Sequence, residues 1–431
     1  MAEGFLYNWR RARYFEPDQE KSTRRARLAG WAEAGALICL TGLAALLPFQ
    51  AITASREICL HLGLFFWLAR MVVLRRWDLV RTPLDIPLAL FLAAGVFSLF
   101  SAVDVAYTWR ELRGEMLKGL LVYYLAVNNL RGEARAGLVC WALIAAAAVM
   151  DVYGVIESFS LPSGRAVFSL HASSPQLFTW LVQSAPFLML GALWFKNKKA
   201  RLAVTLILVL HAAVLYLSLG RMAMVAVVME AALVLYLAGL SRRVILLGCL
   251  AILLGLALLM PRPIITLDDQ SGRELRIGGL AVPGLKSTRL VMWQGAWDHI
   301  RDHPWTGVGF GRRSFVKKYP DYLKIEPEMW HTHNTFISLA VETGLQGLAA
   351  FCLVLYQVFR RLWPGAETAR VWLRSGPAGL MILGALIMAA GFILSNLTND
   401  MFDDDAALLF WLLIGASFSL RQHKAVPAPP D

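Results

Sequence analysis

The sequence predicts an all-α polytopic membrane protein with about twelve transmembrane helices and one large hydrophilic loop. Hydrophobic residues make up 58% of the 431-residue chain, whereas soluble domains contain about 45–50%. The mean hydropathy is +0.55. The apolar residues fall in runs of roughly 18 or more, the length that a helix needs to cross a bilayer. Only a helix satisfies its own backbone in lipid, and the alternation typical of a membrane barrel is absent.

The apolar runs place the expected spans along the chain. The first begins near Trp31, behind about thirty mixed residues, which is too long a preamble for a typical cleaved signal peptide. We therefore expect the first helix to remain as an anchor. All five cysteines lie inside apolar runs, so no disulfide framework is expected. The spans cover roughly residues 31–49, 55–74, 84–101, 115–130, 137–158, 175–195, 201–219, 222–240, 243–260, 334–359, 376–396 and 406–420.

The distribution of lysine and arginine indicates the orientation. The N-terminal segment and the even-numbered loops are basic, and the last outer loop is acidic, so both termini are expected in the cytoplasm. Arg221 departs from this bias, because it occupies a tight outer turn between two apolar spans. It either snorkels to lipid headgroups or faces an anionic substrate at the outer surface. The other outer arginines near the spans are Arg110, Arg113 and Arg165.

The long outer loop, residues 261–333, is the segment most indicative of function. It holds eleven Lys/Arg, eight Asp/Glu and half of the eight histidines, and connections of this length are usually functional. A helix is expected over 288–301, with Arg289 on its polar face, because apolar residues recur at helical spacing. A turn with Pro304, Gly307 and Gly309 follows, able to bring backbone N–H groups close to a ligand. No Walker lysine follows it, which excludes a nucleotide P-loop.

The loop ends at His331 and His333, where the chain re-enters the membrane. His333 can accept a proton near neutral pH, or it only caps or packs at the interface. Two histidines at this spacing are a weak zinc signal without a third ligand. Glu342 follows nine residues after His333, about 900° along an ideal helix, so the two side chains point roughly opposite ways. The intramembrane acids Asp151 and Glu230 are open between functional and structural roles.

The net charge of +12 does not indicate nucleic acid. Cytoplasmic loops that obey the positive-inside bias account for most of the excess, and contact with membrane-lipid headgroups is the better interpretation.

Four motifs together resemble the O-antigen ligase family. His333 and Asn334, nine further residues, and Gly344 with Gly347 are similar to its H-N-x9-G-x-x-G signature. Residues 302–309 resemble its D-H-P-x-x-G-x-G element, Arg289 with Trp293 its R-x-x-x-W helix, and residues 218–221 its S-x-G-R turn. The motifs span residues 218–347 and are specific to the superfamily, but not to one of its members.

This resemblance implies an all-helical glycosyltransferase of the GT-C type in the bacterial inner membrane. The donor would be a glycan on undecaprenyl diphosphate, and the acceptor a sugar hydroxyl of lipid A-core, with no ATP, cofactor or essential metal and with inversion at the anomeric centre. The chain would divide into a cytoplasmic segment (1–30), nine transmembrane helices (31–260), a large periplasmic loop with short helices (261–333), three more helices (334–420) and a cytoplasmic tail (421–431).

The resemblance also assigns roles to residues. His333 would be the general base, and Arg221 and Arg289 would bind the diphosphate, because arginine holds phosphate oxygens bidentately. Topology alone adds Arg110, Arg113 and Arg165 as weaker candidates for the same role. The residues expected to support the pocket are His331, Asn334, His303, Gly307 and Gly309.

Other functions stay open. A polymerase of lipid-linked repeat units and a protein O-oligosaccharyltransferase share the superfamily motifs. A single large outer loop favours the ligase, since polymerases often have two. A transporter of lipid-linked sugars should show paired, broken spans in matching halves, and the sequence has no such symmetry.

Overall fold

The computed structural model describes residues 24–77, 79–162, 166–171, 173–259, 276–277, 280–281, 288–325, 330–402 and 404–423. Within them the chain is helical, apart from a hairpin in which β1 (Arg276–Ile277) pairs antiparallel with β2 (Leu280–Ala281). This confirms the expected all-α fold. The N-terminal segment before Arg24, the C-terminal tail after His423 and most of 260–287 lie outside the described residues.

The helices follow the order that hydropathy predicts. Those before the long loop are α2 (Arg24–Leu46), η1 (Gln50–Ile52), α3 (Thr53–Leu74), α4 (Asp85–Phe97), η2 (Ser98–Ser101), α5 (Val105–Glu111), the π-helix η3 (Leu112–Leu117), α6 (Lys118–Asn129), α7 (Glu133–Ser158), α8 (Ser174–Trp194), α9 (Lys198–Leu217), α10 (Arg221–Ala238) and α11 (Arg242–Leu259). Those in and after it are α12 (Thr288–Asp302), α13 (Ser314–Lys318), α14 (Tyr322–Ile325), α15 (Thr335–Leu362), α16 (Gly365–Ser375), α17 (Pro377–Ser395) and α18 (Asp404–Gln422).

Eight helices within the described residues are long and apolar enough to cross a membrane. They coincide with eight of the twelve expected spans, and the other four overlap α4, α6, α11 and α18. The segment 105–129 is divided among α5, η3 and α6 and carries charged residues, and α18 begins with two aspartates. The structure therefore supports a polytopic membrane protein, with eight spans supported by length and composition.

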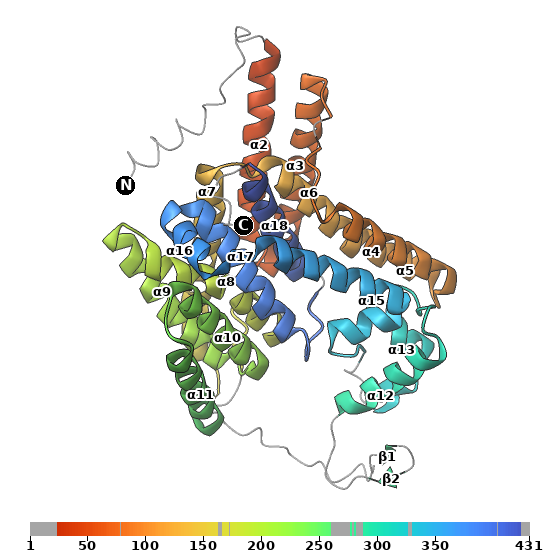
Figure 1. Ribbon diagram of the computed structural model, residues 1–431. Coiled ribbons are helices and arrows are strands. Elements are labelled where there is room, and N and C mark those ends of the chain that lie inside the picture. Colours follow the sequence, from red (N-terminus) through yellow and green to blue (C-terminus); the bar gives the residue numbers. More distant parts are fainter. Residues whose placement is uncertain are drawn as a thin grey trace.

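The bundle has α17 and α18 at its centre (Figure 1). On one flank α17 packs against α8 and α10, and on the other side α18 packs against α6. The helix α15 packs on α4, and α12 from the long loop packs on α15. The short helices α12 and α13 lie together at one end of the molecule beside α15 (Figure 1). This arrangement brings the long loop against the first turns of α15.

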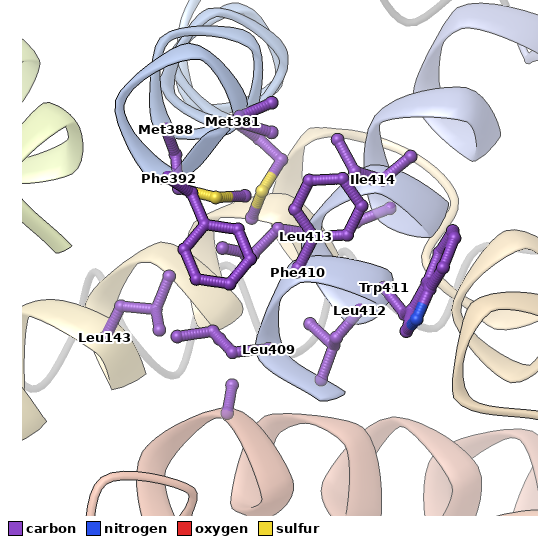
Figure 2. Packing of buried hydrophobic residues seen from close by; sticks show 14 of the residues in the cluster. Leu143, Met381, Met388, Phe392, Leu409, Phe410, Trp411, Leu412, Leu413 and Ile414 are labelled. Carbon is purple, nitrogen blue, oxygen red and sulfur yellow. The ribbon is translucent and has the colours of Figure 1, made fainter. Parts of the chain in front are cut away.

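Aromatic residues fill the contact between the two central helices. The ring of Phe410 on α18 lies 5.7 Å from that of Phe392 on α17 and 5.2 Å from that of Trp411. Trp411 points away from Phe392 (Figure 2) and contacts the ring of Tyr123 on α6 at 6.3 Å. A Cβ on Gly119 would lie 2.5 Å from the Trp411 ring, so glycine lets α6 approach this closely. These contacts join α18 to both α17 and α6.

Two acids inside the bundle have different environments. Asp151 on α7 is fully buried and its Oδ2 lies 2.9 Å from Nδ1 of His211 on α9. The Nε2 of His211 lies 2.9 Å from the carbonyl oxygen of Leu181 on α8, so this pair joins three helices. Glu230 on α10 is fully buried against Gly391 of α17, and neither of its carboxyl oxygens has a hydrogen-bond partner among the described residues.

The helix α15 is broken at Gly344, where φ is 76° and ψ is 174°. The glycine-rich turn pairs with the backbone on the N-terminal side of this break. Val308 N–H donates to the Val341 carbonyl at 2.9 Å, and Gly309 N–H to that of Glu342 at 3.2 Å. Leu345 N–H, just past the break, donates to the Pro304 carbonyl at 2.9 Å. The broken turn is thus the surface on which the long loop docks.

Replacing Gly344 with alanine should destabilise the protein. The new Cβ would lie 2.8 Å from the Trp305 carbonyl oxygen, and a positive φ costs a non-glycine residue about 1–3 kcal/mol. Thermal unfolding of the detergent-solubilised variant measures this loss. Gly248→Ala is the control, because a Cβ there meets nothing within 4 Å. Equal melting temperatures for the two variants would contradict the assignment of the break to Gly344.

Candidate active site

The segment 330–334 is fixed by three neighbouring elements. Trp293 of α12 donates its Nε1–H to the Thr332 carbonyl at 2.7 Å. Asn334 caps α15, its Oδ1 accepting from Phe336 N at 2.9 Å and Ile337 N at 3.1 Å. The Asn334 amide also donates to the Leu397 carbonyl at 2.8 Å. Asn334 therefore supports the site by helix capping, and Trp293 of the R-x-x-x-W helix by holding Thr332.

His333 adopts a left-handed backbone conformation, with φ of 53°. Such a conformation is uncommon for residues other than glycine. Its backbone N–H lies 3.1 Å from Nδ1 of His331, and the two ring centroids are 3.9 Å apart. The capped helix on one side and the buried His331 on the other hold this backbone in place.

The surroundings keep His333 neutral at physiological pH. Burial, followed by the positive charge of Arg289, lowers its pKa to about 4, with Arg312 acting in the same direction and Asp400 opposing. Burial and the Arg312 cation hold the pKa of His331 far below its usual range. A neutral imidazole has a nitrogen lone pair that can accept a proton.

The sequence-predicted arginines occupy different places. Arg289 acts electrostatically on both His331 and His333 from the first turn of α12. Arg110 is 67% exposed at the rim of a cavity described below, with its Nε 3.6 Å from Oε1 of Glu111. Arg113 is exposed on η3 and does not line that cavity.

Arg221 and Arg165 are not joined to His333 by the described structure. Arg221 is exposed in the first turn of α10, and within the described residues no hydrogen bond or ion pair connects it to the segment 330–334. Arg165 lies outside the described residues. Their role in holding the diphosphate stays a prediction.

Two residues that the sequence did not single out stand beside the histidines. Arg312 Nη2 lies 3.3 Å from Nε2 of His331, and its Nε lies 3.7 Å from Oδ2 of Asp400. Asp400 is buried, its Oδ2 lies 3.7 Å from His331 Nδ1, and it accepts hydrogen bonds from Thr335 and Ser338. Both guanidinium carbons of the Arg312–Arg313 pair lie about 5 Å from the Trp330 ring centroid, at 4.8 and 5.1 Å. In the sequence, the two adjacent arginines directly after the glycine-rich turn could have indicated Arg312 as a site residue.

The glycine-rich turn uses its N–H groups within the protein. Besides the two bonds to α15 described above, Phe310 N–H donates to Ser98 Oγ at 3.0 Å and Gly311 N–H to Oε2 of Glu342 at 2.9 Å. A Cβ on Gly307 would lie 2.0 Å from the Glu342 carbonyl oxygen. Gly307 thus permits close contact with α15, and Gly309 has a φ of 103° that favours glycine. The expectation that these N–H groups face a ligand does not agree with this geometry.

His303 and Glu342 are both apart from the His333 ring. His303 is exposed at the end of α12, and its ring lies 5.2 Å from that of His299. Within the described residues no hydrogen bond or ion pair joins Glu342 to His333. His333 precedes the N-cap of α15, so the ideal helix geometry used in the sequence analysis does not apply to this pair.

A cavity of about 400 Å³ lies beside His331. It lies between α4, α5, η3, the turn at 310–313, the first half of α15 and the start of α18. Trp330, Arg312 and Asp400 line it, and each of the three also contacts His331. These three residues separate the cavity from His331, whose ring in turn lies against that of His333.

The comparisons with known proteins bear on residues around this site. Residues 206–352 match the family model described as O-Antigen ligase (Wzy_C). A search of curated proteins finds no match. The matched segment contains α10, α12, the glycine-rich turn, His333 and the break at Gly344. The match supports the resemblance found in the sequence, and residues 206–352 are similar to the O-antigen ligase family.

Proposed function

We propose that this chain is an O-antigen ligase, which transfers a polysaccharide from undecaprenyl diphosphate to a sugar hydroxyl of lipid A-core. The observation that carries the proposal is the neutral imidazole of His333, held close to the cations of Arg289 and Arg312. A base beside guanidinium groups fits a reaction in which a hydroxyl loses a proton while a diphosphate gains charge.

In the proposed reaction, His333 accepts the proton of the attacking hydroxyl as its oxygen bonds to the anomeric carbon of the donor. The bond from that carbon to the diphosphate oxygen breaks, and undecaprenyl diphosphate leaves with the electron pair. Attack from the opposite face inverts the anomeric centre. The leaving group needs no strong acid, because Arg289 and Arg312 offset the charge that develops on it.

Binding of the donor should change the basicity of His333. A base with a pKa of about 4 is weak at neutral pH. A bound diphosphate would neutralise part of the charge of Arg289 and Arg312, the two cations that lower this pKa. The donor would therefore strengthen the base that its own transfer requires.

The proposed location is the bacterial inner membrane, with both termini in the cytoplasm and the site facing the periplasm. The lysine and arginine bias of the loops supports this orientation. Membrane lipids would then surround the apolar helices, and both substrates would reach the site from the outer leaflet.

A reconstituted transfer assay tests the proposal. Purified protein would receive undecaprenyl-diphosphate glycan with and without lipid A-core, in the presence of excess chelator. Glycan should appear on lipid A-core, and His333→Ala should lower the rate by about 10²–10⁴, the usual contribution of a general base. His61→Ala is the control, because that histidine is 73% exposed on α3.

Other outcomes of this assay would support a different function or mechanism. Longer lipid-linked chains with the core ignored would mean a polymerase, and a strict need for metal would restore His331 and His333 as metal ligands. Full activity of His333→Ala would remove the base assignment.

The pH dependence of the transfer rate should reflect the lowered pKa of His333. Activity in kcat/KM should hold down to about pH 5 and fall through a pKa of about 4, because protonation of His333 removes the base. The acidic limb of kcat should lie higher, since the bound diphosphate offsets the two arginines. Steady-state rates between pH 3.5 and 8, with recovery at pH 7 as a check on folding, measure both limbs. If kcat/KM instead fell with an apparent pKa near the ordinary histidine value, about 6.5, the result would contradict this electrostatic account.

Arginine-to-lysine substitutions separate bidentate binding from simple charge. Arg289→Lys and Arg221→Lys should each lose most activity, because lysine keeps the charge but not the planar fork. The transfer assay with saturating acceptor measures the loss, and Arg201→Lys, exposed in the first turn of α9, serves as the control. Normal turnover of Arg221→Lys would leave Arg221 as a residue that snorkels to headgroups.

A further inference from the structure

His331 lies between the proposed base and the Arg312 cation and contacts both. Its Nδ1 lies 3.1 Å from the backbone nitrogen of His333, and its Nε2 lies 3.3 Å from Nη2 of Arg312. We propose that His331 is a positioning residue that accepts a hydrogen bond from only one of these groups at a time, and thereby couples binding of the diphosphate to the conformation of His333. This inference rests on the proposed function and adds a residue that acts through two others.

The number of protons on the His331 ring sets this limit. Both neighbouring groups only donate, because a backbone N–H offers no acceptor and a guanidinium has N–H donors alone. Burial and the Arg312 cation hold the pKa of His331 far below its usual range, so the ring is neutral and carries one N–H. A neutral imidazole accepts only through its other nitrogen. The His333 N–H and the Arg312 guanidinium therefore compete for a single acceptor.

Arg312 should win this competition before the diphosphate binds. A hydrogen bond from a cation is roughly twice as strong as one from a neutral donor. Asp400 adds to the preference, because its buried Oδ2 lies 3.7 Å from Nδ1 of His331 and attracts a proton on that nitrogen. The same oxygen accepts from Ser338 Oγ at 2.6 Å, so its effect on the ring is electrostatic. Nε2 then accepts from Arg312, and the His333 N–H loses its acceptor on the ring.

A bound diphosphate should reverse the preference. Phosphate oxygens bind a guanidinium in pairs, so Arg312 would donate to the diphosphate instead of Nε2. The ring proton then favours Nε2, and Nδ1 accepts from the His333 N–H. In this change Asp400, the carboxylate beside Nδ1, takes the proton that leaves that nitrogen, and Nε2 gains one from solvent. Asp400 returns its proton to solvent, so the ring and the carboxylate keep their charges.

The consequence falls on the backbone of His333. Its φ of 53° is a conformation that a residue other than glycine holds only when its surroundings enforce it. The bond from the His333 N–H to Nδ1 of His331 is one such constraint. If that bond forms fully only after Arg312 has turned to the diphosphate, the proposed base is fixed in place when a donor is bound.

The first experiment reads the position of the ring proton directly. Nitrogen NMR of the full-length protein, labelled with ¹⁵N in its eight histidines, distinguishes a protonated from an unprotonated ring nitrogen. The His331 signals are identified by their absence in His331→Gln. Wild-type protein should carry the proton on Nδ1, and Arg312→Met should move it to Nε2. Arg313→Met is the matched control, because Arg313 lies over the same Trp330 ring but has no hydrogen bond to His331 among the described residues.

Undecaprenyl diphosphate added to the wild-type protein should cause the same change as Arg312→Met. A proton on Nε2 already in the wild type, or one that stays on Nδ1 in Arg312→Met, overturns the inference. A change in Arg312→Met that the diphosphate does not reproduce would keep the competition at His331 and reject the diphosphate contact of Arg312 in the proposed function.

The second experiment separates the two contacts by kinetics. In His331→Asn the amide oxygen takes the place of Nδ1, and in His331→Gln it reaches that of Nε2. His331→Asn should keep kcat within about twofold and lower KM for the donor, because Arg312 is no longer held by the ring. His331→Gln should lower kcat about tenfold, the effect of one lost hydrogen bond, with KM for the donor unchanged. His61→Asn and His61→Gln are the controls, since that side chain is 73% exposed.

Equal losses of kcat in His331→Asn and His331→Gln, or no loss in either, would leave His331 with a packing role only and overturn the inference. Thermal unfolding of both variants checks that they fold, and the NMR measurement on the wild type decides the question if they do not.

Discussion

The backbone contact between the glycine-rich turn and the broken turn of α15 holds the candidate site together. Gly307 lets the turn approach the Glu342 carbonyl, and Gly344 ends the regular helix so that two N–H groups of the turn can pair with α15. Arg312 follows this contact directly in the sequence, which places it against His331 and Asp400. Because the helix is interrupted at Gly344, this contact can form, and it fixes the Arg312 cation near the proposed base.

Hydropathy and spacing predicted most of the fold. The helix expected over 288–301 is observed at Thr288–Asp302, and the re-entry at residue 334 begins α15 one residue later. Eight spans are supported by length and composition, and the others overlap helices in which charge or shortness weakens the apolar signal. Periodicity reports these helices because they depend on neighbours within a few turns. The closeness of His333 and Arg289, which interact electrostatically, is not a local feature, and only the resemblance to a family assigned both residues to one site.

The rest of the site depends on contacts between distant segments, which no local pattern reports. In the sequence, Asp400 is only one of several acids in the last outer loop. In the fold it is buried against the first turns of α15. The positive φ of His333 depends on the neighbouring segments that hold its backbone, and the sequence analysis did not predict it. The prediction for the glycine-rich turn was wrong for the same reason. The sequence suggested that its backbone N–H groups would face a ligand, but in the fold they donate to Ser98, Val341 and Glu342.

The buried pair of Asp151 and His211 has a consequence for how the bundle forms in the membrane. An aspartate at the centre of a lone helix costs about 2.5–3.5 kcal/mol to insert. In the folded chain this cost is offset by His211 on α9, which also contacts the Leu181 carbonyl of α8. During synthesis α7 leaves the ribosome first and lacks its partner until two more helices have followed. We expect these three helices to enter the lipid as one unit, so that insertion of the early half of the chain is cooperative.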